Sequence, residues 1–265
     1  MNRLCFVMFF FITSQCFAAW EWHDRSAREW ATHLPQLLTE STDTSGWKFL
    51  ASVVHPFGVP EISAGHLRGT YWQNRWLLDG QLYQLGTDGY RETAIGVKGG
   101  IRRDRYWLAG GVRIGWVDVP PKPVRVVEAL LLDAGYRYRM ATFFGTVELP
   151  LQTSENSPIA FPMRSSVVTF LQPLEHWRIG AAYSLYKTEH EFGIGGEWTP
   201  FPEFSLRIGT DPDRGWGAGV ALRLRGFSLS FASFSVEPAG WSSLWSAEVS
   251  SYTPKPGFRY PVTPP

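Results

Sequence analysis

The chain has 265 residues, with 25 basic and 24 acidic side chains and a formal net charge of +1. This balance argues against a nucleic-acid partner, because phosphate binding relies on an excess of lysine and arginine. The two cysteines, Cys5 and Cys16, lie in a segment that we expect to be removed, which excludes disulfides and cysteine metal sites from the mature chain.

The first 18 residues have the layout of a secretory signal peptide. Basic Arg3 precedes an apolar run over residues 4–12, and the stretch ends in the small residues Ala18 and Ala19. We expect cleavage after one of these alanines, because a membrane-spanning helix needs about 20 apolar residues and this run is shorter. The mature chain is therefore expected to be exported.

Residues 19–46 form a polar segment before the main domain. One short helix is predicted at residues 26–34, with Ser26 as its N-cap, Glu29 three residues on, and Pro35 as its stop. We expect this segment to lie in the periplasm or to plug the domain that follows, and the sequence leaves both placements open.

From residue 47 to residue 252 the side chains alternate with the period of two that is typical of β-strands. In one stretch, Trp216, Val220 and Leu222 alternate with glycines and then with Arg223 and Arg225. The apolar face fits lipid, while a face of glycine and arginine fits a barrel lumen. The prediction is all-β, a transmembrane antiparallel up-and-down β-barrel of about 14 strands. A water-soluble β-sandwich is the alternative.

The connections between these strands differ in length according to their order in the chain. Long connections follow the odd-numbered strands and tight turns follow the even-numbered ones, as in bacterial barrels whose short turns face the periplasm. Both termini would then face the periplasm, including the proline-rich tail at residues 253–265. The predicted strands span about 47–55, 64–73, 75–86, 90–101, 105–117, 125–139, 141–150, 164–172, 176–186, 190–199, 203–210, 215–225, 227–236 and 242–252.

Tryptophan placement gives a second indication of a membrane domain. The indole ring prefers the depth of the lipid headgroups, so tryptophans at strand ends predict two interfacial girdles. The turn-side girdle is predicted from Trp47, Trp72, Trp76, Trp107, Trp177 and Trp198, and the loop-side girdle from Trp116, Trp216 and Trp241.

The charged residues of the inward face are the candidate functional residues. They are Lys98, Arg105, Arg113, Asp133, Arg137, Arg139, Glu148, Arg178, Glu191, Glu197, Arg207, Arg223, Arg225 and Glu248. One interpretation is an ion-pair network that fills a narrow barrel. The other is a selective polar pathway in which Arg207, Arg223 and Arg225 form an anion-favouring wall. The inward glycines, Gly193, Gly195, Gly209, Gly217 and Gly219, indicate either strand curvature and close packing or space for a ligand.

Catalysis is not expected. The six histidines are scattered over the amino-terminal segment, loops and turns, and no two have the spacing of a metal site or a catalytic triad. We accordingly predict no enzyme activity, no metal and no cofactor.

The strings His55-Pro56-Phe57-Gly58-Val59-Pro60-Glu61 and Tyr90-Arg91-Glu92, and the run from Phe201 to Ser235, resemble proteins of the FadL/PorV-like superfamily of outer-membrane barrels. The resemblance implies a barrel of fourteen strands. FadL-type members pass hydrophobic compounds through a barrel with an N-terminal hatch, and PorV-type members act in type IX secretion.

The resemblance implies a transport or secretion-associated barrel that passes small or hydrophobic compounds or serves type IX secretion. The alternative is a closed structural or adaptor barrel that binds a protein through its loops or tail. The expected partners are outer-membrane lipid and other envelope or secretion proteins, and the oligomeric state stays open.

Overall fold

The computed structural model of the protein describes residues 14–15, 45–55, 63–87, 89–103, 105–121, 124–151, 163–174, 176–186, 189–211, 215–237 and 240–251. Our predictions for the signal-peptide cleavage site, for the helix at residues 26–34 and for the tail at residues 253–265 lie outside these ranges. No helix in the described part of the chain is long and apolar enough to cross a membrane.

The described residues form one antiparallel β-barrel of fourteen long strands, which confirms the predicted fold class. Each long strand lies within a few residues of its predicted span. They are β2 Ser45–His55, β3 Ser63–Gln73, β4 Trp76–Thr87, β5 Tyr90–Arg103, β6 Tyr106–Asp118, β7 Arg125–Tyr138, β8 Ala141–Pro150, β9 Arg164–Leu174, β10 Trp177–Tyr186, β11 Glu189–Phe201, β12 Phe204–Asp211, β13 Gly215–Leu224, β14 Phe227–Glu237 and β15 Gly240–Ser250.

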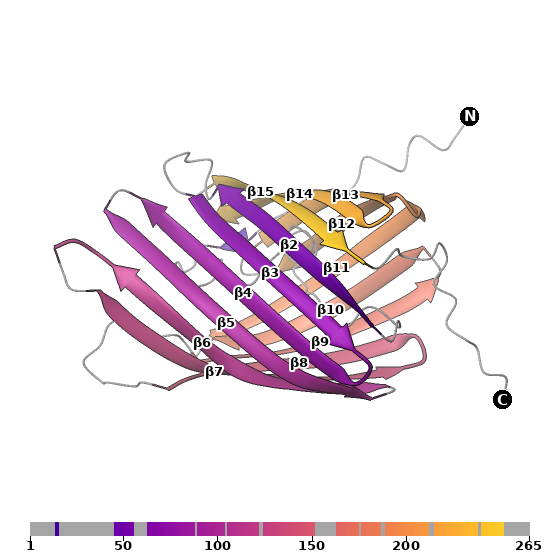
Figure 1. The fold of residues 1–265 in the computed structure, drawn as a ribbon. Helices are drawn as coiled ribbons and strands as arrows, with labels where there is room; N and C mark the ends of the chain where they lie inside the picture. Colours follow the sequence, from indigo (N-terminus) through magenta and orange to yellow (C-terminus); the bar gives the residue numbers. More distant parts are fainter. Residues whose placement is uncertain are drawn as a thin grey trace.

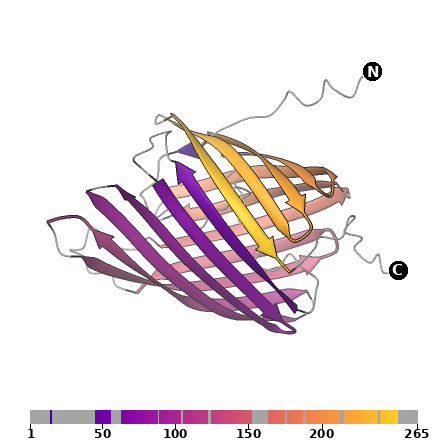
Figure 2. The ribbon, with the colours of Figure 1, turned by 45° about the horizontal axis from the view of Figure 1, so that its top comes forward.

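The strands pair in chain order, and the wall closes where the last strand meets the first. β15 pairs with β2 from Ser243↔His55 to Ser250↔Lys48, so the sheet has no open edge at this seam. Figures 1 and 2 show the indigo strand β2 beside the yellow strand β15. Closure pairs the backbone groups that lipid could not satisfy. A short strand, β1 (Ser14–Gln15), pairs in parallel with the end of β14 that extends beyond β13.

The two ends of the barrel have different connections, as the sequence predicted. At one end, which we call the turn end, every connection has two residues: 74–75, 104–105, 139–140, 175–176, 202–203 and 225–226. At the other end, the loop end, the connections include the longer segments 56–62, 119–124 and 151–163. Long loops at one end only are typical of outer-membrane barrels.

Side chains alternate between the outer surface and the lumen along each strand. On β4, Trp76, Leu78 and Leu82 are exposed on the outer face, whereas Asp79 and Gln81 between them are buried. The outer face is a continuous apolar surface of large side chains, which in water would drive aggregation and in lipid is stabilising. This pattern places the polar side chains inside the barrel.

Trp107 and Trp72 face the lumen, which makes their assignment to the interfacial girdle wrong. Trp107 is 4% exposed and stacks on Phe144, with ring centroids 6.0 Å apart. Its ring also covers Gly135, where an added Cβ would overlap the indole. Because adjacent residues of a strand point in opposite directions, the neighbouring Tyr106 faces lipid instead.

Candidate functional site in the barrel lumen

The middle of the lumen carries a chain of buried ion pairs on β3 to β7. Arg68 Nε donates to Asp79 Oδ1 at 2.9 Å, and the Thr70 hydroxyl donates to the same oxygen at 2.8 Å. Lys98 Nζ lies 3.9 Å from Asp79 Oδ2 and 2.8 Å from Asp133 Oδ2. Lys98 therefore links a carboxylate on β4 to one on β7, so the charges of four strands form one connected group.

A second pair continues this group along the wall. Arg113 on β6 donates through Nη1 to both oxygens of Glu148 on β8, at 2.7 and 2.9 Å. Both side chains are buried, and a pair of this geometry keeps its charges satisfied away from water. Here again the pair skips one strand and follows the wall.

The opposite part of the wall holds a carboxylate shared by two arginines. Glu197 Oε1 on β11 accepts from Arg207 Nε at 3.1 Å and from Arg223 Nη2 at 2.8 Å. Arg207 also donates to the Ser230 hydroxyl, and Arg223 to the Ser205 hydroxyl, each at 3.3 Å. Each arginine thus has a carboxylate and a hydroxyl as partners, as expected for the ion-pair interpretation of these residues.

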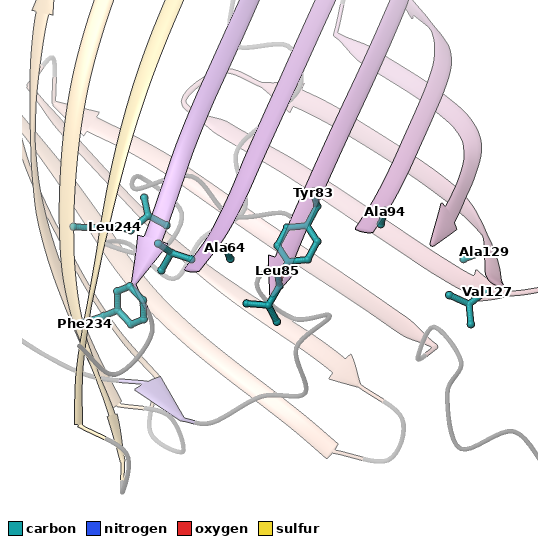
Figure 3. Packing of buried hydrophobic residues seen from close by; sticks show 10 residues of the cluster. Ala64, Tyr83, Leu85, Ala94, Val127, Ala129, Phe234 and Leu244 are labelled. Carbon is teal, nitrogen blue, oxygen red and sulfur yellow. The ribbon is translucent and has the colours of Figure 1, made fainter. Parts of the chain in front are cut away.

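One side of the loop-end half of the lumen, formed by β14, β15, β2 to β5 and β7, is largely apolar. A cluster of buried side chains lines it, composed of Val54, Ala64, Tyr83, Leu85, Ala94, Val127, Ala129, Ala232, Phe234 and Leu244. Figure 3 shows Tyr83, Leu85, Phe234 and Leu244 projecting from their strands into the barrel interior. We call this set the apolar ring. On these strands the lumen surface therefore changes from charged in the middle to largely apolar toward the loops, whereas Glu148 and Glu191 keep the loop end of β8 and β11 polar.

One carboxylate interrupts the apolar ring. Glu92 on β5 lies between Leu85 on β4 and Val117 on β6 in the strand register, and it is 1% exposed. Its Oε2 has no hydrogen-bond partner among the described residues. Burial of a carboxylate without a hydrogen-bond partner lowers the stability of a protein. Packing therefore does not explain why a glutamate occupies this position.

An aromatic group occupies the turn-end half of the lumen on β6 to β10. Trp107, Phe144, Val168, Phe170 and Ala182 pack together there. The guanidinium carbon of Arg178 lies 4.1 Å from the centre of the Phe170 ring, which is cation–π geometry. The predicted lumen residue Arg178 is thus held on this aromatic group.

The structure places the other predicted lumen residues as follows. Glu191 is buried on the inward face of β11, at its loop end. Arg137 lies on β7, where its backbone N–H donates to the Arg105 carbonyl at 2.6 Å. The inward glycines Gly193, Gly195, Gly209, Gly217 and Gly219 are all buried on the lumen face.

Three arginines assigned to the lumen lie in turns instead. Arg225 and Arg139 are the first residues of two-residue turns, have φ values of 51° and 49°, and are exposed. Arg105 is exposed in the turn between β5 and β6. The anion-favouring wall of three arginines is therefore reduced to Arg207 and Arg223, because the strand that carries Arg223 ends at Leu224.

The remaining predicted girdle tryptophans lie near strand ends and point outward. Trp177 and Trp198 stack on the outer face at the turn end, with ring centroids 5.7 Å apart. Trp47, Trp76, Trp216 and Trp241 are also exposed on the outer face. Two bands of indole rings thus lie near the two ends of the strands.

Arg68, Asp79 and Glu92 also face the lumen and were not among the predicted lumen residues. The alternation of inward and outward side chains could have identified them. For example, Arg68 alternates with Leu67 and Gly69, and Asp79 alternates with Leu78 and Gly80. Among the described residues, no three histidine, cysteine, aspartate or glutamate side chains form a group able to hold a metal ion.

Comparison with known proteins shows the likeness at the level of fold. No protein-family model matches the chain, and no curated protein matches it. Among solved structures, the chain is similar to a FadL homologue from Pseudomonas aeruginosa, with a TM-score of 0.50 and 10% identity over 78% of this chain and 90% of that one.

A mutant of the Rhodopseudomonas blastica porin is also similar, with a TM-score of 0.45 and 10% identity over 78% of this chain and 98% of the porin. With its closed wall of fourteen antiparallel strands and its apolar outer surface, the chain has the fold of an outer-membrane-type β-barrel.

Proposed function

We propose that the chain is a bacterial outer-membrane barrel that passes small or hydrophobic compounds along its lumen. The observation that carries this proposal is the change of the lumen surface from paired charges in the middle to the apolar ring near the loops. A mouth that is apolar on one side and leads to a polar interior suits compounds that leave a lipid or apolar phase and cross toward water.

The ion pairs support a route along the barrel axis. Lys98–Asp133, Arg113–Glu148 and Arg223–Glu197 each join next-nearest strands, and Arg207–Glu197 joins neighbours. Pairs of this kind run around the wall instead of bridging the barrel. These ion pairs therefore place charge on the lumen wall and do not cross the lumen.

The experiment compares two phenylalanines of β14 that face opposite ways. Phe234 is fully buried in the apolar ring, and Phe231 packs against Trp245 on the outer face. Purified protein in vesicles should take up small apolar probes faster than protein-free vesicles. Phe234→Ala should change that rate severalfold and Phe231→Ala should leave it unchanged.

The rival is a closed structural or adaptor barrel that binds a protein partner through its loops. It predicts no uptake and no planar-bilayer current, either for the full chain or after deletion of residues 20–44. A role as a component of type IX secretion rests on the sequence resemblance. Deletion of the gene would favour this role over transport through the lumen if it blocked secretion and left the uptake of small compounds by the cells unchanged.

A further inference from the structure

The exposed arginines of the turn end are concentrated on one side of the barrel. Arg75, Arg105 and Arg139 belong to the three turns that join β3 to β4, β5 to β6 and β7 to β8, and Arg103 is the last residue of β5 before the second turn. All four are exposed, and the only acid that the sequence places in these turns is Asp104. We call this group the arginine turns.

The backbone brings these turns side by side. The N–H of Arg102 donates to the carbonyl of Arg75 at 2.6 Å, which joins the first turn to the end of β5, beside the second turn. The Arg137 N–H donates to the Arg105 carbonyl at the same distance, which joins the second turn to the end of β7, beside the third turn. Figures 1 and 2 both show β3 to β8 as consecutive neighbours of the wall. The four positive charges therefore form one patch.

The patch lies at the edge of the lipid-facing surface. Arg103 ends the outward-facing series of β5, following Val97 and Ile101. The guanidinium carbon of Arg139 lies 5.4 Å from the centre of the Tyr138 ring, which is itself on the outer face. Arginine beside outward aromatic rings is positioned at headgroup depth.

The other half of the turn end differs in charge. The turns after β9 and β11 contribute His176 and the exposed acid Glu203, and only Arg225 is basic in the turn after β13. The asymmetry means that the patch is a local feature and not a general charge of this end. Cations near a membrane surface attract anionic lipid electrostatically.

We propose that the arginine turns bind the phosphate headgroups of anionic phospholipid, of the phosphatidylglycerol type, in the leaflet at the turn end. Guanidinium groups match phosphate geometry, and the aromatic side chains Trp76, Tyr106 and Tyr138 are exposed on the outer face beside them. The inference is independent of what passes through the lumen.

The test uses the full-length protein in neutral detergent micelles, titrated by calorimetry with dihexanoyl phosphatidylglycerol or with the matching phosphatidylcholine. The wild type should bind the anionic lipid about tenfold more tightly than the zwitterionic one. The variant R75Q/R103Q/R105Q/R139Q should lose this preference. The double variant R103Q/R105Q, which keeps half the patch, should lose part of it and serves if the quadruple variant does not fold.

The matched control is R91Q/R225Q, which removes two exposed arginines outside the patch, one at the loop end and one on the opposite turns. It should keep the wild-type preference. Equal losses in R103Q/R105Q and in this control would overturn the proposal, because net charge alone would then explain binding. Equal affinity of the wild type for the two lipids would also overturn it, as would binding of a glutamate-rich peptide in place of the anionic lipid.

Discussion

Replacement of the shared carboxylate by an amide, Glu197→Gln, should destabilise the barrel strongly. The carboxylate accepts from Arg207 at 3.1 Å and from Arg223 at 2.8 Å, and the Glu197 side chain is only 6% exposed. Glutamine keeps the shape and loses the charge, so two guanidiniums would remain in the lumen without their anion. Breaking a buried pair in this way costs about 3 to 5 kcal/mol.

The same substitution at Glu248 provides the matched control. Glu248 Oε2 pairs with Lys48 Nζ at 2.8 Å, but these side chains are 28% and 24% exposed. A partly hydrated pair contributes at most about 1 kcal/mol, so Glu248→Gln should have a small effect. The free energy of unfolding is measured by urea titration of the protein refolded into lipid vesicles. Equal losses for the two variants would refute the reasoning, since burial would then have no influence on the cost.

Three further predictions concern packing, lipid depth and orientation. Gly135→Ala should cost about 1 to 3 kcal/mol in the same titration, because the new methyl group would overlap the indole of Trp107, and Trp107→Leu in the same chain should restore most of the loss. On the lipid face, Val220→Arg at mid-strand should cost about 2 to 4 kcal/mol, and an arginine nearer the turn should cost less, so equal penalties would contradict a membrane-spanning β13. A tag inserted between residues 154 and 158 should be labelled on intact cells and one at Arg103 should not, and reversed labelling would invert the proposed orientation.

Strand positions could be predicted from the sequence because a strand with one face in lipid has to alternate. On β13, Val220 and Leu222 face outward and Arg223 faces inward, as the period of two predicted. The same alternation could have shown that Trp107 faces the lumen. Arg113 lies six residues further along β6 and was assigned to the lumen, so Trp107 had to share its face.

The contacts between lumen charges could not be predicted from alternation. Lys98 reaches Asp133 across an intervening strand, and Arg113 reaches Glu148 in the same way. Which side chains meet across a skipped strand depends on the tilt and stagger of the whole wall, which no single strand encodes. Arg225 was misassigned for a local reason, since a boundary error of one residue moves a side chain from the lumen into a turn.

The seam between β2 and β15 has a consequence for how the protein is made. The Trp47 N–H donates to the Ser251 hydroxyl at 2.9 Å, and these residues are 204 positions apart in the chain. Until the last strand is present, β2 and the growing end both expose unpaired backbone groups, which hydrocarbon tolerates poorly. Closure therefore joins the first long strand of the barrel to the last one. The entropy lost in bringing two such distant segments together makes closure slow. A chain that loses its final strand should be a substrate for proteolysis and not a smaller barrel.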